Sequence, residues 1–212
     1  MSDRPLVAVL DYGIGNLASA QKALAHEGAD ARLTADLGLI GDAVGVVLPG
    51  VGAFGACMDA LRKVRLDDAA LAAVESGRPF FGICVGMQML FDGSEEAPGV
   101  SGLGVIPGTV RWIPPGVKRP QMQWNTLDIT RPDDPMFAGL RAEAWVYFVH
   151  SLHGVPSDPG HVAATCDYGG PLTAAVRIGT VFATQFHPEK SSTAGLTVLR
   201  NFVAVAAGLV RV

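Results

Sequence analysis

The sequence has few charged residues and no long apolar segment. Charged residues make up 17% of the 212 residues, the net charge is −4, and no basic run is longer than Lys118-Arg119. A nucleic-acid-binding surface needs clustered lysine and arginine, so we expect no nucleic-acid partner. Residues 202–210 are too short to span a bilayer, which takes about 20 residues. The first residues lack the features of a signal peptide, so we expect a cytoplasmic protein with no membrane partner.

Cysteine is also scarce: Cys57, Cys84 and Cys166 are scattered, and none belongs to a Cys-x-x-Cys pair. This spacing argues against a disulfide framework and against a thiolate zinc site. His150 and His153 have no third ligand at a sensible spacing, and we interpret them as a strand that leads into a loop. Cys57 and Cys166 lack flanking glycine turns, which indicates small buried residues. We expect no metal and no cofactor.

The segment around Cys84 is different, because an apolar run enters Gly82-Ile83-Cys84-Val85-Gly86 and a helix-prone segment follows. This pattern is typical of a nucleophile elbow, a strand that turns sharply into a helix, with cysteine where many hydrolases carry serine. Glycines permit the strained turn, and the start of a helix favours the reactive thiolate. We interpret Cys84 as a nucleophile. The alternative is a buried cysteine of a β–α unit that happens to be flanked by glycines.

A second motif, Gln185-Phe186-His187-Pro188-Glu189-Lys190, contains a residue suited to act as the base. Residues i and i+2 of extended backbone point to the same face, so His187 and Glu189 can project together. Cys84, His187 and Glu189 then have the roles of nucleophile, base and orienting group. Taken alone, His187 would be a surface histidine at a turn. Beside a cysteine elbow, the catalytic interpretation is favoured.

Apolar runs alternate with helix-period segments in the first half of the chain. Strands are predicted at 5–10, 29–34, 44–48 and 79–83, and helices at 17–27, 56–62 and 67–75. This alternation predicts an α/β fold with a doubly wound, mostly parallel sheet and helices on both faces. Later runs at 104–112, 145–149, 161–165, 174–177 and 181–186 predict hairpins that extend the sheet in mixed orientation, before a helix at 191–207. No repeat or linker divides the chain, so residues 1–212 are expected to form one domain.

Two glycine-rich turns, at residues 13–18 and 50–55, both match the dinucleotide-binding fingerprint and both follow a predicted strand. Two matches in one small domain lower the value of each, so we do not expect nicotinamide binding. Gly50, Val51 and Gly52 fit better as a flexible backbone strand whose N–H groups turn toward a developing oxyanion. The alternative is a plain connection between strand and helix.

Together, residues 82–88 and 186–189 resemble the class I (triad) glutamine amidotransferase family. Narrower motifs resemble its imidazole glycerol phosphate synthase branch, the glutaminase subunits of histidine biosynthesis: residues 11–16, 48–54, 88–91, 94–96, 147–151 and 187–192. The resemblance covers nearly the whole chain. The sequence departs from the family pattern at Gln123, where glycine is usual, and at Leu152, where an aromatic residue is usual.

The resemblance implies glutamine hydrolysis, with Cys84 as nucleophile, His187 as acid and base, and Glu189 holding the imidazole. It implies oxyanion donors from the backbone at Gly50, Val51, Gly52 and Val85. It implies glutamine contacts from Gln88, Glu96, His150 and Ser151. Without the resemblance, Glu95 and Glu96 are interpreted equally well as a pair of solvent-exposed side chains or as a contact for the ammonium group of an amino-acid substrate.

The resemblance also implies a partner. In this branch the ammonia passes to a separate (βα)8-barrel cyclase subunit that makes imidazole glycerol phosphate and AICAR, so we expect a heterodimer. The matching interface positions are Asn16, Trp124, Asn125, Tyr147 and Lys190, although each is also readable as an ordinary core or surface residue. The glutaminase is expected to be nearly idle until the cyclase binds its nucleotide ligand.

Three alternatives remain open at this point. The chain is also compatible with the glutaminase of another amidotransferase, such as anthranilate synthase, and with a lone thiol hydrolase. The third alternative is a catalytically inactive module that stabilises a partner.

Overall fold

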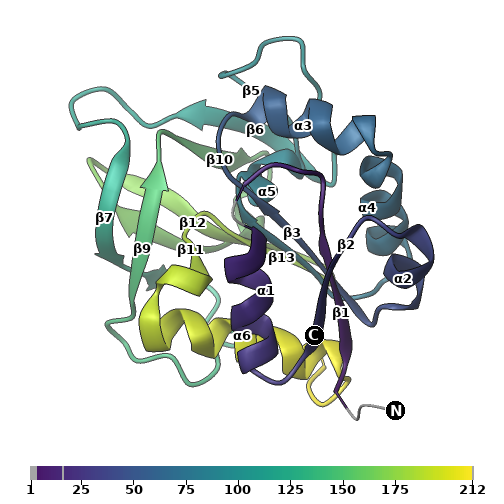
Figure 1. Cartoon of the computed structure of the whole chain (residues 1–212). Coiled ribbons are helices and arrows are strands. Elements are labelled where there is room, and N and C mark those ends of the chain that lie inside the picture. Colours follow the sequence, from purple (N-terminus) through teal and green to yellow (C-terminus); the bar gives the residue numbers. More distant parts are fainter. Residues whose placement is uncertain (1–3, 16, 212) are drawn as a thin grey trace.

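An eight-stranded sheet forms the centre of the computed structural model, which describes residues 4–15 and 17–211 (Figure 1). Its order is β2-β1-β3-β4-β13-β12-β11-β8, and the first five strands run parallel. These five are β2 (Asp30–Thr34), β1 (Leu6–Leu10), β3 (Gly45–Gly50), β4 (Phe80–Cys84) and β13 (Val181–Thr184). β3 and β4 are buried along their whole length, which explains why apolar residues dominate both.

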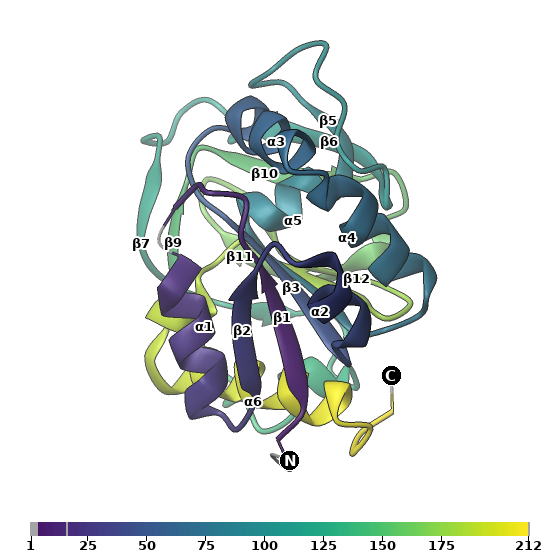
Figure 2. The same ribbon diagram turned by 45° about the vertical axis from the view of Figure 1, so that its right-hand side comes forward.

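Helices cover both faces of this sheet, as the alternating sequence pattern predicts. They are α1 (Leu17–His26), α2 (Leu37–Asp42), α3 (Phe54–Lys63), α4 (Leu66–Glu75), α5 (Val85–Met89) and α6 (Ser192–Ala206). α1 lies beside α6 on one face, whereas α4 contacts α2 and α3 on the other (Figures 1 and 2). The prediction of a doubly wound sheet is confirmed. In the described part of the chain, no helix has the length and apolar character needed to cross a membrane.

The second half of the chain extends the sheet only in part. β12 (Pro171–Ile178) and β11 (Val162–Asp167) continue it in antiparallel orientation after β13, as predicted. A short strand that was not predicted, β8 (Asp128–Ile129), pairs with β11 and ends the sheet. The runs at 104–112 and 145–149 do form strands, β6 (Ile106–Trp112) and β9 (Trp145–His150), but neither joins the main sheet. That part of the prediction is wrong, because each strand pairs with a segment that the apolar pattern did not reveal.

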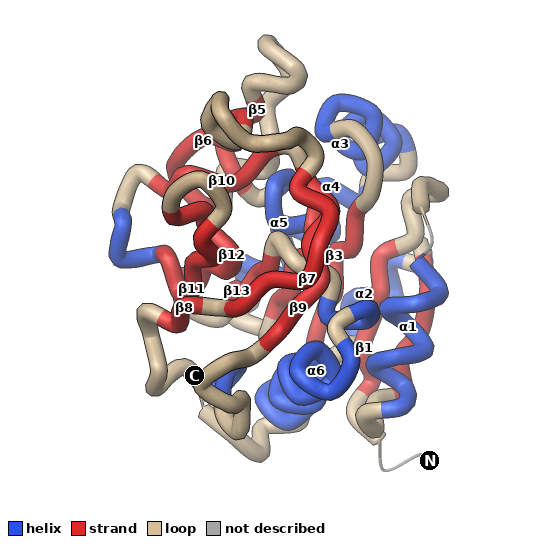
Figure 3. Tube along the Cα trace, turned by 90° about the vertical axis from the view of Figure 1, so that its left-hand side faces the viewer, coloured by secondary structure: helices blue, strands red, loops and turns tan. Residues whose placement is uncertain are grey.

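Two small sheets contain those segments. One has the order β10-β6-β5, with β10 at Leu152–Pro156 and β5 at Phe91–Ser94. The other pairs β9 with β7 (Gln121–Thr126), and Figure 3 shows this pair side by side on the face turned toward the viewer. The predicted loop after His150 is therefore wrong, since β10 begins only two residues later. Short 3₁₀ turns complete the structure at Pro135–Phe137, Pro159–His161 and Pro188–Lys190.

An aromatic cluster fixes the central strand against the helix that closes the fold. The ring of Phe81 on β4 lies 5.5 Å from that of Phe182 on β13 and 5.3 Å from that of Phe202 on α6, between centroids. Tilted pairs of this kind contribute about 0.5–1.5 kcal/mol each beyond their buried area. β4 is thus a rigid base for the residue at its carboxyl end, Cys84.

Candidate active site

The turn at Cys84 has the strained geometry of a nucleophile elbow. β4 ends at Cys84, whose φ and ψ are 55° and −112°, and α5 begins at the next residue. A positive φ at a residue with a Cβ is unfavourable, and such residues persist only where their surroundings enforce the conformation. A Cβ on Gly86 would overlap the carbonyl oxygen of Leu48, so α5 touches the backbone of β3 directly. The predicted elbow is present, and its second glycine is required by this contact.

His187 and Glu189 form a buried pair beside the elbow. Nδ1 of His187 lies 2.8 Å from Oε1 of Glu189, and the two side chains are 3% and 7% exposed. The backbone N–H of His187 donates to the carbonyl oxygen of Tyr147 at 3.1 Å, which holds the residue against β9. The alternative of a surface histidine at a turn is therefore excluded by its burial.

The surroundings of His187 favour its charged form. Burial lowers the pKa of His187, but hydrogen bonds and charge interactions with Cys84 and Glu189 outweigh this effect and raise the pKa to about 10. Oε2 of Glu189 is buried and has no hydrogen-bond partner among the described residues. With a pKa of about 10, the His187 ring is charged at neutral pH.

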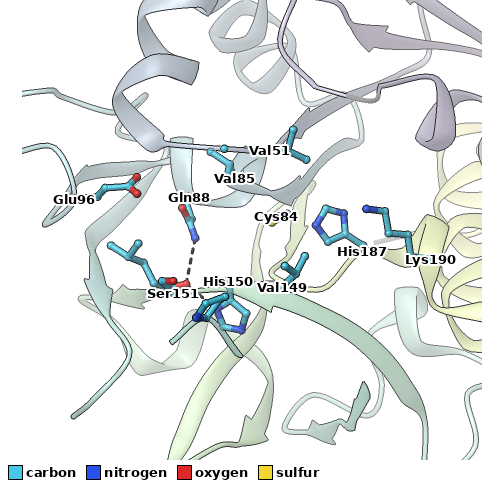
Figure 4. Close-up of a pocket in the computed structure, with 13 residues that line it drawn as sticks. Val51, Cys84, Val85, Gln88, Glu96, Val149, His150, Ser151, His187 and Lys190 are labelled. Carbon is cyan, nitrogen blue, oxygen red and sulfur yellow. Dashed lines mark hydrogen bonds between the residues drawn. The ribbon is translucent and has the colours of Figure 1, made fainter. Parts of the chain in front are cut away.

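A pocket of about 470 Å³ opens above this pair and collects most of the predicted site residues (Figure 4). It is lined by Val51, Gly52, Cys84, Val85, Gln88, Glu96, His150, Ser151 and His187, together with Pro120, Val149, Leu152 and Lys190. Gly50 lies beneath the pocket, opposite Cys84 in the β3–β4 register. The structure thus brings together residues from both halves of the sequence.

Gln88, which lines the pocket, is hydrogen-bonded to a second buried amide, that of Gln185. Nε2 of Gln88 donates to the carbonyl oxygen of Leu152 at 3.2 Å and to Oε1 of Gln185 at 3.0 Å. Nε2 of Gln185 in turn donates to Sγ of Cys84, at 3.6 Å. No role was predicted for Gln185 from the sequence. Its position two residues before His187 was the available signal, because such residues share a face in extended backbone.

The two adjacent glutamates separate in the structure. Oε2 of Glu96 accepts a hydrogen bond from the backbone N–H of Phe54 at 2.7 Å, at the start of α3, where Ala53 provides no side-chain cap. Glu95 is exposed and accepts from the N–H of Trp112 at 2.9 Å. Only Glu96 lines the pocket, so the two are not a solvated pair.

His150 lines the pocket, but its ring is already engaged with the protein. Nδ1 lies 2.7 Å from the carbonyl oxygen of Leu152, and Nε2 lies 2.9 Å from the side-chain amide of Gln121. Burial lowers the pKa of His150 to about 4, so the ring is neutral at neutral pH. The side chain therefore supports the pocket wall and leaves no ring nitrogen free for a ligand.

The predicted interface residues lie mostly on the β7–β9 pair. Trp124 and Tyr147 face each other in register with ring centroids 6.1 Å apart, and Trp124 is 44% exposed. Nδ2 of Asn125 donates to the carbonyl oxygen of Asp167 at 2.9 Å. Lys190 differs from these residues because it lines the pocket. Asn16 lies outside the described residues.

Cys57 and Cys166 are both buried, as predicted. Burial raises the pKa of each thiol, to about 11 for Cys166, so both remain protonated at neutral pH. Across the described residues, no group of three or more His, Cys, Asp or Glu side chains is arranged to hold a metal ion.

Comparison with known proteins shows similarity over almost the whole length. Residues 9–206 match the family described as glutamine amidotransferase class-I. The chain is 48% identical over 210 residues to imidazole glycerol phosphate synthase subunit HisH of Synechococcus elongatus, covering 98% of this chain and 96% of that protein. It is 48% identical over 204 residues to the subunit of the same name from Halobacterium salinarum, covering 93% and 92%.

Solved structures show the same fold at lower identity. A glutamine amidotransferase crystal structure superimposes with a TM-score of 0.75 at 24% identity, covering 95% of this chain and 98% of that one. PurLQS from Thermotoga maritima gives a TM-score of 0.73 at 20% identity, covering 94% and 97%. These likenesses confirm the predicted α/β fold class.

Proposed function

The chain belongs to the class I glutamine amidotransferase family, and from that premise we propose that Cys84, His187 and Glu189 are its catalytic triad. The enzyme is the glutamine amidotransferase subunit of imidazole glycerol phosphate synthase: it hydrolyses glutamine and supplies the cyclase subunit in histidine biosynthesis. The observation that carries the triad is the convergence of Cys84, the buried His187–Glu189 pair and the amide of Gln88 around one pocket. The complete triad disfavours an inactive module.

The chemistry follows from the charge state of the site. The Cys84 thiolate attacks the side-chain amide carbon of glutamine, and imidazolium His187 gives its proton to the nitrogen that leaves as ammonia. Neutral His187 then takes a proton from water as the water attacks the γ-glutamyl thioester. Collapse of the intermediate breaks the C–S bond, releases glutamate and restores the Cys84 thiolate and the His187 imidazolium. Glu189 orients the ring throughout, since it bonds Nδ1 and leaves Nε2 for the proton transfers.

The tetrahedral intermediates need donors for a developing oxyanion. We assign this role to the backbone at Val85, the first residue of α5, and to the segment formed by Gly50, Val51 and Gly52. Two observations support the assignment: Val51, Gly52 and Val85 line the pocket with Cys84, and Gly50 is its register neighbour on β3.

Four residues are assigned to the glutamine itself: Gln88, Glu96, His150 and Ser151. All four line the pocket. Nε2 of Gln88 already donates hydrogen bonds to Leu152 and Gln185, so Oε1 of Gln88 is the atom left to accept from an N–H of the substrate. The carboxylate of Glu96 suits the substrate ammonium group. His150 contributes through its position in the wall, since its ring nitrogens are occupied.

The direct test of the triad is Cys84→Ala. We expect the variant to release no ammonia from glutamine, while the fold and the complex with the cyclase persist, because the side chain is small and lies at the end of a rigid strand. Ammonia release measured by a coupled assay, with circular dichroism and gel filtration as controls, checks this. Retained glutaminase activity in Cys84→Ala would refute the nucleophile assignment.

We propose that the cyclase is a (βα)8-barrel that docks near Trp124, Asn125, Tyr147 and Lys190, and also near Asn16. The exposed ring of Trp124 beside Tyr147 supports an apolar contact there. The isolated chain should hydrolyse glutamine slowly, and adding the cyclase with its nucleotide ligand should raise the rate by orders of magnitude. Full activity in the isolated chain would contradict this control. Co-purification of a chorismate-using subunit instead of the cyclase would contradict the partner.

Two broader proposals complete the assignment. Residues 1–212 are interpreted as a single glutamine amidotransferase domain, which is supported by one continuous core cluster that includes residues of both halves. A cytoplasmic location fits a biosynthetic enzyme that acts on a free amino acid. Fractionation of cells that express the chain tests the location.

A further inference from the structure

Gln185 is a fully buried polar residue that the proposed mechanism does not use. It directly follows β13, its exposed fraction is 0%, and its backbone N–H donates to the carbonyl oxygen of Ala174 at 2.8 Å. Its side chain reaches the nucleophile, with Nε2 at 3.6 Å from Sγ of Cys84. A buried amide costs free energy unless both its ends are hydrogen-bonded, so the partners of this amide deserve an explanation.

The direction of the Gln185 amide follows from its neighbours. The carbonyl oxygen of Leu152 can only accept, so the Gln88 atom 3.2 Å away must be the amide nitrogen. The same nitrogen lies 3.0 Å from the Gln185 amide and requires an acceptor there, which is Oε1. Nε2 of Gln185 is then the atom that faces sulfur. One backbone oxygen therefore sets the orientation of two side-chain amides in succession.

We propose that Gln185 donates a hydrogen bond from Nε2 to Sγ of Cys84 and thereby favours the thiolate, with its orientation relayed from Leu152 through Gln88. A thiolate accepts hydrogen bonds more strongly than a thiol, and a bond to a charged acceptor is about twice as strong as one between neutral groups. The inference rests on the proposed role of Cys84 as nucleophile. It makes Gln185 a further residue in contact with a reacting atom.

Other groups also interact with Cys84, and the test must separate their effects from that of Gln185. His187 interacts electrostatically with Cys84, and so do Tyr12 and Cys57. Gln121 provides a matched comparison within the same chain. It is equally buried, and its side-chain amide lies 3.9 Å from the sulfur of a different cysteine, Cys166.

The test compares Gln185→Met and Gln121→Met in the full chain. Iodoacetamide alkylation is followed across pH on the Cys84 peptide by mass spectrometry, which separates it from Cys57 and Cys166. We expect Gln185→Met to slow alkylation of Cys84 at pH 7 about tenfold and to move its pH profile upward, because a hydrogen bond to the charged form is lost. Gln121→Met should keep the wild-type profile. An unchanged profile in Gln185→Met, or an equal shift in both variants, overturns the inference.

A second variant, Gln185→Glu, keeps the size and shape of the side chain and serves if the methionine variant does not fold. Its carboxylate can still accept from Gln88, but it presents an oxygen rather than a donor to the sulfur. Alkylation at pH 7 should be slower than in wild type by at least the same tenfold factor. A wild-type rate would overturn the inference. Glutamine turnover by the wild type is measured separately, so failure of the proposed function is seen independently of the alkylation result.

Discussion

The nucleophile elbow and the segment proposed to supply the oxyanion donors lie at the ends of neighbouring strands but are held by different interactions. With Pro49 included, residues 49–52 are called the oxyanion segment below. The elbow is fixed by backbone against backbone: Gly86 has no space for a Cβ because of the carbonyl oxygen of Leu48. The oxyanion segment is held by side chains. Oη of Tyr12 donates to the carbonyl oxygen of Pro49 at 2.7 Å, and Sγ of Cys57 donates to that of Val51 at 3.2 Å.

This difference separates a fixed part of the site from an adjustable one. In a trans peptide the N–H points opposite to the preceding C=O, so Tyr12 sets the direction of the Gly50 N–H and Cys57 that of the Gly52 N–H. Burial raises the pKa of both the Tyr12 hydroxyl and the Cys57 thiol, so both groups stay protonated and able to donate. The proposed nucleophile is thus positioned by backbone contacts, whereas the proposed oxyanion donors depend on two side-chain hydrogen bonds.

The largest effect is expected where the elbow meets β3. In Gly86→Ala the added methyl group would overlap a carbonyl oxygen of a central strand, and neither backbone can move freely. We expect a loss of about 3 kcal/mol or more in the free energy of unfolding, together with the loss of glutaminase activity. Urea unfolding and the ammonia assay measure both. A variant that keeps wild-type stability would show that the elbow is not fixed by this contact.

The next effect concerns the His187–Glu189 pair, which belongs to the fixed part. Glu189→Gln removes the negative charge, so the pKa of His187 should fall from about 10 and kcat should drop about a hundredfold or more. His187 has a pKa raised above its ordinary 6.5, so charged His187 stabilises the fold fully below pH 6.5 and loses this effect as the pH rises through 10.

The pH dependence supplies the control for Glu189→Gln. The wild type should be more stable than the variant at pH 6, and the part of the difference due to His187 should vanish above pH 10. Unfolding at several pH values and an NMR titration of His187 test this. A stability difference that does not change with pH would contradict the charged pair.

A smaller effect is expected at the adjustable part. Tyr12→Phe removes the donor to Pro49 but keeps the ring, so we expect a loss of about 1 kcal/mol in unfolding free energy. In the complex with the cyclase, kcat should fall about tenfold with little change in KM, because oxyanion donors act mainly in the transition state. Cys57→Ser keeps a donor and should retain more activity than Cys57→Ala. Equal activity of the two Cys57 variants would show that the hydrogen bond from Cys57 to Val51 does not support the oxyanion donors.

The contrast between the two parts also explains what the sequence could reveal. The elbow and the parallel strands were predictable, because glycine spacing and buried apolar runs are local patterns. The small helix α2 also had a local signal, its cap Asp36, which accepts from the N–H of Leu39 at 2.8 Å. β7 was missed because its residues are mostly polar and exposed.

The side-chain contacts that hold the oxyanion segment and Cys84 could not be predicted in the same way. Tyr12 meets Pro49 and Gln185 meets Cys84 across long stretches of sequence, and no local pattern records such contacts. Of Tyr12 and Gln185, Gln185 alone had a local signal, its position two residues before His187. Their roles depend on the pairing order of the strands, which brings distant segments to one edge of the sheet.

A comparably small effect is expected for Gly52→Ala, the counterpart of Gly86→Ala in the adjustable segment. Gly52 has a φ of +91°, and a Cβ there would meet no atom within 4 Å. The cost is then only that of an unfavourable backbone conformation, about 1–2 kcal/mol. The chain can relieve this cost by rotating the peptide, so kcat in the complex should fall while the fold persists. Unfolding and ammonia release measured side by side for both alanine variants test the contrast. A larger loss of stability in Gly52→Ala than in Gly86→Ala would reverse the assignment of fixed and adjustable parts.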